Sequence, residues 1–70
     1  MNAAVTSKEE ILKTSRELIR KQGWSSVSIR SVAAACGVSV GTIYNYFDSK
    51  AALLSETVGS VWQEIFHRPD

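Results

Sequence analysis

Apolar residues recur at helical spacing in the first third of the chain. They lie along one face of an amphipathic helix, with one small polar residue among them, and are Ile11, Ser15, Leu18 and Ile19. Ser7 stands three residues before Glu10, which is the spacing of a capping box at the start of a helix. Gly23 is suited to end the helix, because glycine readily adopts the conformations that close one. We therefore predict a helix between Ser7 and Gly23.

A second, shorter helix is predicted from Ser28, with Val27 and Val32 at the spacing of a hydrophobic staple. Its apolar face comprises Ile29, Val32, Ala33 and Cys36. A free cysteine on an apolar stripe is normally a small packing residue, so Cys36 is interpreted as part of the core. Trp24 follows the glycine that ends the first helix, and we expect its ring to fold back and fill the space between the first two helices.

The stretch ACGVSVGTIYNYF, residues 35–47, holds two helix ends and almost no loop. Gly37 can close the preceding helix in the left-handed conformation, and Ser39 can cap the next helix with its hydroxyl. We predict that this next helix is short and runs from Val40 to Tyr46. Two apolar residues four positions apart anchor it in the core, namely Ile43 and Phe47. A helix, a three-residue turn with glycine and a second short helix form the plan of a helix-turn-helix.

A fourth helix is predicted to begin near Ser49 and to run to about His67, with Pro69 as its stop. Its apolar stripe consists of Leu54, Val58, Val61, Trp62 and Ile65, widened by Leu53, Thr57 and Phe66. Gly59 inside the helix indicates either a weak point or a close packing contact. Three short helices can cover only the first half of this stripe, so we expect its C-terminal end to be exposed, as interfaces are. The chain is then either a fragment or a protein that pairs with something.

These elements predict an all-α protein in which a homeodomain-like, three-helix head is followed by a fourth, linking helix. Seventy residues amount to one small domain. We divide the chain into a flexible arm (residues 1–6), the helix-turn-helix head (7–48) and the fourth helix (49–70).

The distribution of charge is more informative than its total, which is +1 at pH 7. Residues 1–50 carry seven Lys or Arg against four acids, a net charge of +3. Residues 51–70 carry one Arg against three acids, a net charge of −2. The basic excess lies with the helix-turn-helix and is a weak indication of a phosphate-bearing partner.

The predicted short helix turns small side chains with hydroxyl and amide groups outward, and no acid occurs in this region before Asp48. Such a surface suits a groove of DNA. Gly41 allows the backbone to approach a ligand closely, and Asn45 can bond to adenine through both of its polar atoms. Lys50 stands in the first turn of the fourth helix, where a cation opposes the helix dipole. A bound phosphate would reverse the sign of that effect.

Plainer interpretations of the same residues stay open. Tyr44 and Tyr46 point to different faces of the short helix, and they are either contacts to phosphate or a thymine methyl, or aromatic residues at the edge of the core. Arg30, in the first turn of the second helix, can contact a guanine edge or a phosphate, or can simply be exposed. Asn45 and Lys50 are residue types that are often only solvated.

Chemistry other than binding finds little support in the sequence. We find no nucleophile with a base, no paired carboxylates, no phosphate loop and no metal-ligand spacing, so neither an enzyme nor a cofactor or metal site is expected. A single cysteine cannot form a disulfide within the chain. The first ten residues lack the apolar core of a signal peptide, and no apolar run approaches membrane-spanning length. We expect a cytoplasmic protein without a membrane partner.

From Ile11 to Leu54 the chain resembles the DNA-binding domain of the tetracycline-repressor (TetR) family of bacterial regulators. The resemblance rests on the apolar stripe of the first helix, on Gly23 with the aromatic residue after it, and on the run SIRSVAAACGVSVGTIYNYFDSKAALL. The most specific part of that run is residues 37–54. Cys36 departs from the family pattern, in which a small alanine is usual.

The resemblance implies a bacterial transcriptional repressor, associated with the nucleoid, whose short helix enters the major groove of double-stranded DNA at half of a palindromic operator. It also implies that residues 49–70 begin an all-helical C-terminal domain that this chain lacks. That domain would bind a ligand and form the dimer, so a homodimer is expected only when it is present.

The resemblance also indicates which residues face DNA. Together with Ser28, which neighbours Arg30, the expected DNA-binding residues are Ser28, Arg30, Ser39, Val40, Gly41, Thr42, Tyr44, Asn45, Tyr46 and Lys50. The positions that match common phosphate contacts are Tyr44, Tyr46 and Lys50. The positions that vary between members, and so read different operators, are Arg30, Val40 and Asn45.

A rival interpretation is a small protein-interaction module that docks a partner through Trp62, Ile65 and Phe66 and does not contact DNA. The two interpretations predict responses on different surfaces. DNA binding would perturb residues 39–50 and depend steeply on salt, whereas docking would perturb residues 58–66 and depend little on salt.

Overall fold

The computed structural model describes residues 6–66 of the chain. Within them lie four α-helices and one short 3₁₀ helix, which are α1 (Lys8–Gln22), η1 (Trp24–Ser26), α2 (Ile29–Cys36), α3 (Val40–Tyr44) and α4 (Lys50–Phe66). The all-α prediction and the order of the helices are confirmed. The expected flexible arm, apart from Thr6, and the expected helix end at His67 and Pro69 lie outside the described residues.

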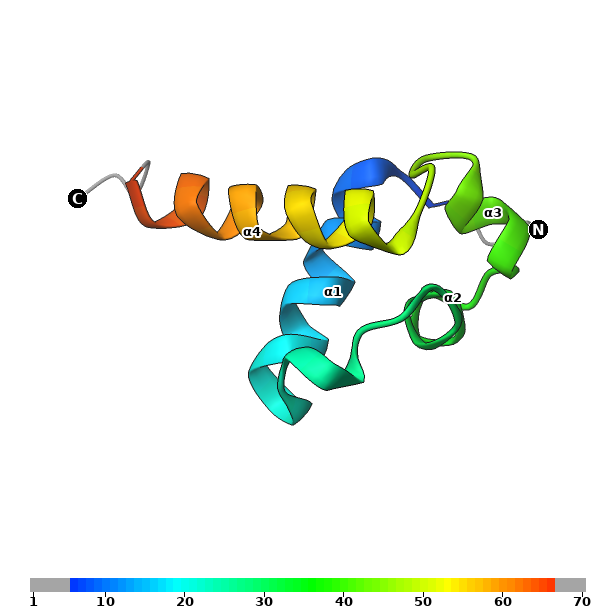
Figure 1. Cartoon of the computed structure of the whole chain (residues 1–70), viewed down its shortest axis with the longest axis horizontal. Coiled ribbons are helices and arrows are strands. Elements are labelled where there is room, and N and C mark those ends of the chain that lie inside the picture. The colour runs from blue at the N-terminus through cyan, green and yellow to red at the C-terminus, as the bar shows by residue number, and fades with distance from the viewer. Residues whose placement is uncertain (1–5, 67–70) are drawn as a thin grey trace.

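Helices α1, α2 and α3 form the head, and α4 crosses α1 and extends away from it (Figure 1). Helix α1 packs against α2, η1 and α4, while α2 packs against α3. The C-terminal part of α4 therefore lies at the opposite end of the molecule from α3 (Figure 1). Over the range 6–66, no helix combines the length and the apolar character needed to cross a membrane.

The ends of α1 lie where the sequence predicts, but the capping box at its start is only half formed. The Ser7 hydroxyl accepts a hydrogen bond from the Glu10 N–H at 3.2 Å, and the Glu10 side chain makes no return bond to the Ser7 N–H within the described residues. At the other end, Gly23 adopts a φ of 90° and its N–H donates to the Ile19 carbonyl at 2.8 Å. Ser15 is fully buried, and its hydroxyl donates to the Ile11 carbonyl at 3.0 Å, so this small residue brings no unpaired polar group into the core.

The core of the head is formed by apolar residues from every α-helix and from the segments that join them. These buried residues are Ile11, Val27, Ile29, Val32, Ala33, Ile43, Phe47 and Leu53. Cys36 is half-buried and packs against this cluster, as expected for a structural cysteine. Burial of these side chains is the main source of stability in a domain of this size.

The predicted position of Trp24 is wrong, because its side chain is 53% exposed. The residues after Gly23 form the 3₁₀ turn η1, and the Ser26 hydroxyl donates to the Gly23 carbonyl at 2.7 Å. Val27 follows this turn and is fully buried in the core of the head. The valine, and not the indole, is therefore the buried side chain of this segment.

The buried face of α4 differs from the predicted one by a rotation of one residue. Leu53 and Thr57 are fully buried, whereas Leu54 and Val58 are only half-buried. Both pairs are four residues apart and fit the helical period equally well. Thr57 can face α1 because its hydroxyl donates to the Leu53 carbonyl at 2.7 Å and is thereby satisfied within its own helix.

The C-terminal part of α4 confirms one prediction and corrects another. Trp62 and Ile65 are each 54% exposed, as expected for the uncovered end of the stripe. Gly59 is exposed, and a Cβ placed on it would meet no atom within 4 Å. The close packing contact considered for this glycine is therefore absent, and the weak point in the helix remains as the interpretation.

Candidate nucleic-acid interface

The turn between α2 and α3 has the geometry predicted for a helix-turn-helix. Gly37 lies in the left-handed region, with φ 74° and ψ 29°. The chain reverses there because the Gly37 N–H donates to the Ala34 carbonyl at 3.2 Å and the Val38 N–H donates to the Ala33 carbonyl at 3.0 Å. These bonds satisfy the last carbonyls of α2 and fix the direction in which α3 begins.

Ser39 caps α3, as predicted. Its hydroxyl accepts from the Thr42 N–H at 3.1 Å and lies 3.0 Å from the Thr42 hydroxyl. Two of the predicted site residues are thus joined to each other at the start of the helix. Ser39 is exposed and Thr42 half-buried, so the paired hydroxyls lie at the surface.

Helix α3 is two residues shorter than predicted and ends at Tyr44. Its last turn tightens, because the Asn45 N–H is shared between the Gly41 and Thr42 carbonyls, both at 3.1 Å. The tight turn leads the chain to Phe47, which is 2% exposed and anchors the segment together with the fully buried Ile43. Tyr46 therefore lies just beyond the helix rather than on it.

The opposite side of α3 is open to solvent. It presents Val40, Gly41, Tyr44 and Asn45, all of which are exposed. A Cβ on Gly41 would meet only the Ser39 hydroxyl, at 3.7 Å, so the packing of the protein itself leaves room for a side chain there. The polar atoms on this side of α3 are those of Tyr44, Asn45 and the backbone. None of its four exposed residues is charged.

Tyr46 is 39% exposed, and its hydroxyl donates to the Thr6 carbonyl at 3.1 Å. The bond joins the segment after α3 to the residue that precedes the cap of α1. Tyr44 is 50% exposed and makes no such bond within the described residues. From the sequence, both tyrosines are expected to contact phosphate, but in the structure only the Tyr46 hydroxyl already has a hydrogen-bond partner among the described residues.

The start of α2 holds two further predicted residues. Ser28 and Ser31 form a reciprocal capping box, in which the Ser28 hydroxyl accepts from the Ser31 N–H at 3.0 Å and the Ser31 hydroxyl accepts from the Ser28 N–H at 2.9 Å. The Ser31 hydroxyl also donates to the Ser26 carbonyl at 2.7 Å. The cap holds this helix start rigidly, and Arg30 projects from it as an exposed side chain.

The start of α4 is built in the same way. The Ser49 hydroxyl accepts from the Ala52 N–H at 3.1 Å, and Lys50 is the first residue of the helix and is exposed. A short connection links α3 to this helix start, so the two lie close together along the chain (Figure 1). An ammonium group beside free N–H groups at a helix start is suited to an anion.

Lys8 makes two contacts that were not predicted from the sequence. Its ammonium lies 3.1 Å from the Glu56 carboxylate of α4 and 5.5 Å from the centre of the Phe47 ring. It therefore joins the start of α1 to the segment after α3 and to α4. The sequence does contain an indication of these contacts. Lys8 is a cation in the first turn of a helix, where it opposes the helix dipole as Lys50 does, and such a cation is expected to have a compensating partner.

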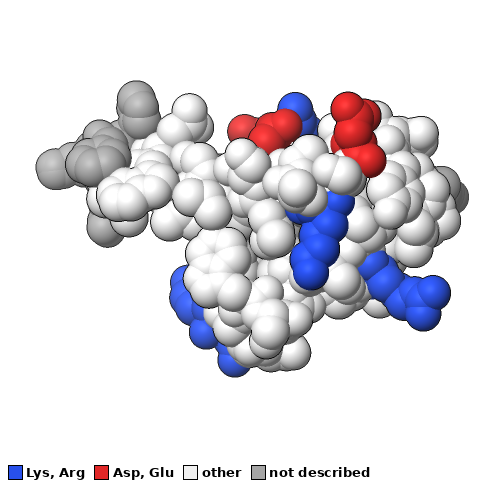
Figure 2. All heavy atoms as spheres, in the orientation of Figure 1, with Lys and Arg blue, Asp and Glu red and all other residues white. Residues whose placement is uncertain are grey.

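The charges on the face drawn in Figure 2 are unevenly distributed. Acidic side chains gather along the upper edge, by α4, and basic side chains lie mainly below them (Figure 2).

Residues 11–57 match the family described as bacterial regulatory proteins, tetR family. The chain belongs to this family. TetR-family membership confirms the resemblance inferred from the run between Ser28 and Leu54. It also makes the helix-turn-helix a DNA-binding element of transcription regulation, and it does not favour the docking module considered as a rival.

Several curated proteins are similar to this TetR-family chain. The uncharacterized HTH-type transcriptional regulator YerO of Bacillus subtilis (strain 168) is 47% identical over 47 residues, which cover 67% of this chain and 16% of YerO. The HTH-type transcriptional repressor KstR of Mycolicibacterium smegmatis is 35% identical over 63 residues, 90% of this chain and 31% of KstR. The HTH-type transcriptional regulator UidR of Escherichia coli (strain K12) is 33% identical over 55 residues, 79% of this chain and 28% of UidR.

The chain thus spans less than a third of the length of each of these TetR-family relatives. No solved structure matches it significantly.

Proposed function

We propose that the chain binds double-stranded DNA in a sequence-specific manner, with α3 in the major groove. The observation that carries the proposal is the exposed, uncharged side of α3, which is held between the Gly37 turn and the capped start of α4. A helix in this setting can bring its side chains and its backbone against base edges.

The residues proposed to contact DNA fall into two groups. Val40, Gly41 and Asn45 lie on the exposed side of α3, where base edges would be read, and Arg30 is proposed to read a guanine edge from the start of α2. The groups proposed to hold the phosphate backbone are the hydroxyls of Ser28, Ser39, Thr42 and Tyr44 and the ammonium of Lys50. Tyr46 is proposed as a weaker contact, because its hydroxyl must first leave the Thr6 carbonyl. The capped starts of α2 and α4 would add N–H groups that favour an anion.

The proposed target is one half of a palindromic operator, as in a bacterial repressor of the cytoplasm that acts at the nucleoid. A single head would bind weakly, because the gain from occupying two half-sites at once requires a dimer. We propose that the dimer forms only when a C-terminal domain follows α4.

Selection of binding sites from a pool of random duplexes tests this function directly. The chain, immobilised at low salt, is expected to enrich a short half-site within a few rounds, and a palindrome when it is presented as an artificial dimer. A variant with Gly41→Glu, which places an acid on the proposed groove surface of α3, is expected to enrich nothing. Recovery of random sequence by the unaltered chain at every salt concentration would contradict sequence-specific binding.

A further inference from the structure

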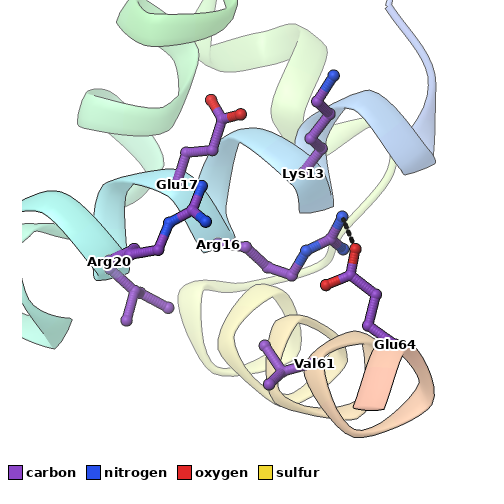
Figure 3. Close-up of a pocket in the computed structure, with 7 residues that line it drawn as sticks. Lys13, Arg16, Glu17, Arg20, Val61 and Glu64 are labelled. Atoms are coloured by element: carbon purple, nitrogen blue, oxygen red, sulfur yellow. Dashed lines mark ion pairs between the residues drawn. The ribbon is translucent and has the colours of Figure 1, made fainter. Parts of the chain in front are cut away.

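Helices α1 and α4 line a groove of about 430 Å³. Figure 3 shows that the Arg16 side chain reaches from α1 toward Glu64 of α4. Arg20 lines the same groove from the next turn of α1, and Val61 lines it from α4. Within residues 6–66, Arg16 is the one basic residue of the groove that forms an ion pair.

Arg16 contacts two residues of α4 at the same time. Its Nη1 donates to the Ser60 hydroxyl at 2.9 Å, and its Nη2 lies 3.5 Å from the Glu64 carboxylate. The Ser60 hydroxyl donates its own proton to the Thr57 carbonyl at 2.8 Å, so its oxygen is oriented to accept from the guanidinium. The Arg16 side chain is only 23% exposed, whereas that of Glu64 is 68% exposed.

Apolar burial between α4 and the head ends before these contacts. Leu53 and Thr57 are fully buried, but no residue from Val58 to Ile65 is. Ser60 and Glu64 continue the face of Leu53 and Thr57 at helical spacing. Packing at Leu53 and Thr57 therefore holds α4 against the head at one place along its length, and the two-pronged contact of Arg16 is a further, specific fastening farther along the same helix. Guanidinium suits this role because its donors are held in a rigid fork.

We propose that Arg16 is a positioning residue for DNA binding, which sets the direction of α4 on α1 and thereby the place of Lys50 relative to α3. The proposal rests on the proposed function, in which Lys50 contacts phosphate. Ser60 lies ten residues beyond Lys50, about 15 Å along the helix axis, so a change of direction at the far end moves the start of α4 as well. When the fastening is lost, α4 samples several directions, and the apparent affinity falls with the share of molecules in the binding-competent one.

The test compares Arg16→Ala with Arg20→Ala, which removes the same charge from the same helix and groove but leaves the fastening intact. Residual dipolar couplings of the 70-residue chain without DNA report the direction of α4 relative to α1. We expect the couplings of α4 as a whole, residues 50–65, to shrink or to fit a different direction in Arg16→Ala and to match the unaltered chain in Arg20→Ala. Ser60→Ala, which favours the helix, is expected to give part of the same change, and Arg16→Lys is expected to restore part of it.

DNA binding provides the second readout. For Arg16→Ala we expect affinity to fall about three- to tenfold with an unchanged salt dependence, because no phosphate contact is removed. Arg20→Ala is expected to bind like the unaltered chain. Unchanged direction of α4 in Arg16→Ala, or a loss of affinity equal in both variants, would overturn the proposal. Failure of the unaltered chain to bind any DNA would instead contradict the proposed function, while the couplings would still decide whether Arg16 sets the direction of α4.

Discussion

The hydroxyl of Tyr46 donates a hydrogen bond to the main-chain carbonyl of Thr6 at 3.1 Å, across 40 residues of sequence. The bond fastens the segment that follows α3 to the segment that precedes α1. A phosphate oxygen only accepts hydrogen bonds, so a phosphate and Thr6 would compete for the same Tyr46 proton. The neighbouring Tyr44 has a hydroxyl without such a partner in the described part of the chain.

Removal of the two tyrosine hydroxyls is expected to separate these roles. Tyr44→Phe should weaken binding to all DNA sequences by about 1 kcal/mol, as for the loss of one hydrogen bond to phosphate. Tyr46→Phe should instead lower the thermal stability of the free protein slightly and have a smaller effect on DNA affinity. Fluorescence anisotropy with labelled duplexes and thermal unfolding measure the two effects. Equal losses of affinity in the two variants would contradict this difference and would show that the bond to Thr6 does not weaken a contact of Tyr46 with phosphate.

Lys50→Ala is expected to weaken binding to every sequence alike. If the Lys50 ammonium contacts a phosphate, its loss should reduce the slope of log K against log salt by about one unit. Lys21→Ala, which removes a charge from the exposed last turn of α1, serves as the matched control and should leave the slope nearly unchanged. An unchanged slope in Lys50→Ala would remove this residue from the phosphate contacts.

Asn45→Ala and Arg30→Ala are expected to change sequence preference rather than affinity in general. Each pair of hydrogen bonds to a base edge contributes about 1–3 kcal/mol of discrimination at one base pair. Site selection with each variant should therefore show a relaxed preference at one or two adjacent positions and an unaltered preference elsewhere. A uniform loss of affinity with the same selected sequence would reassign the residue to the DNA backbone.

Two glycines with open space around them are expected to respond to alanine in opposite directions. Gly37 has a φ of 74°, so Gly37→Ala should destabilise the fold by about 1 kcal/mol through the left-handed conformation alone. Gly59 lies inside α4, so Gly59→Ala should stabilise it by up to about 1 kcal/mol. For a domain of this size these changes correspond to about 4–8 °C in Tm, which calorimetry resolves. Destabilisation by both substitutions would contradict the open surroundings of Gly59.

Local signals predicted the helices and their ends well. The caps at Ser7, Ser28, Ser39 and Ser49 and the left-handed turn at Gly37 depend on residues a few positions apart, and the structure contains all of them. The turn at Gly37, with its short flanking helices, is also what made the helix-turn-helix and the family resemblance recognisable.

Predictions of which residue is buried were wrong where two choices fitted the local sequence equally well. Contacts with other parts of the chain decided between them. The stripes through Leu53 and through Leu54 fit the same helix, and the position of α1 selected the first, in which Thr57 is buried. Trp24 and Val27 are both large apolar residues after the end of α1, and in the 3₁₀ turn η1 the tryptophan is exposed while the valine that follows is buried. These choices depend on where other helices lie, which spacing along one helix does not specify.

The candidate site was predictable as a set of residues but not as a set of contacts. The sequence indicated which side of α3 is open, because Ile43 and Phe47 mark the buried side. It did not reveal that the Tyr46 hydroxyl is bonded to Thr6, that Lys8 pairs with Glu56, or that Arg16 spans the two helices. All three contacts join residues about 40 or more positions apart.

Backbone amide NMR during titration with mixed-sequence duplex DNA at low salt tests the central claim most directly. The account predicts chemical-shift changes clustered at residues 28–30, at residues 39–46 and at Lys50, which added salt reverses. Residues 58–65 should change little. Shift changes confined to residues 58–65, or a well-dispersed spectrum that DNA leaves unchanged, would contradict binding through α3.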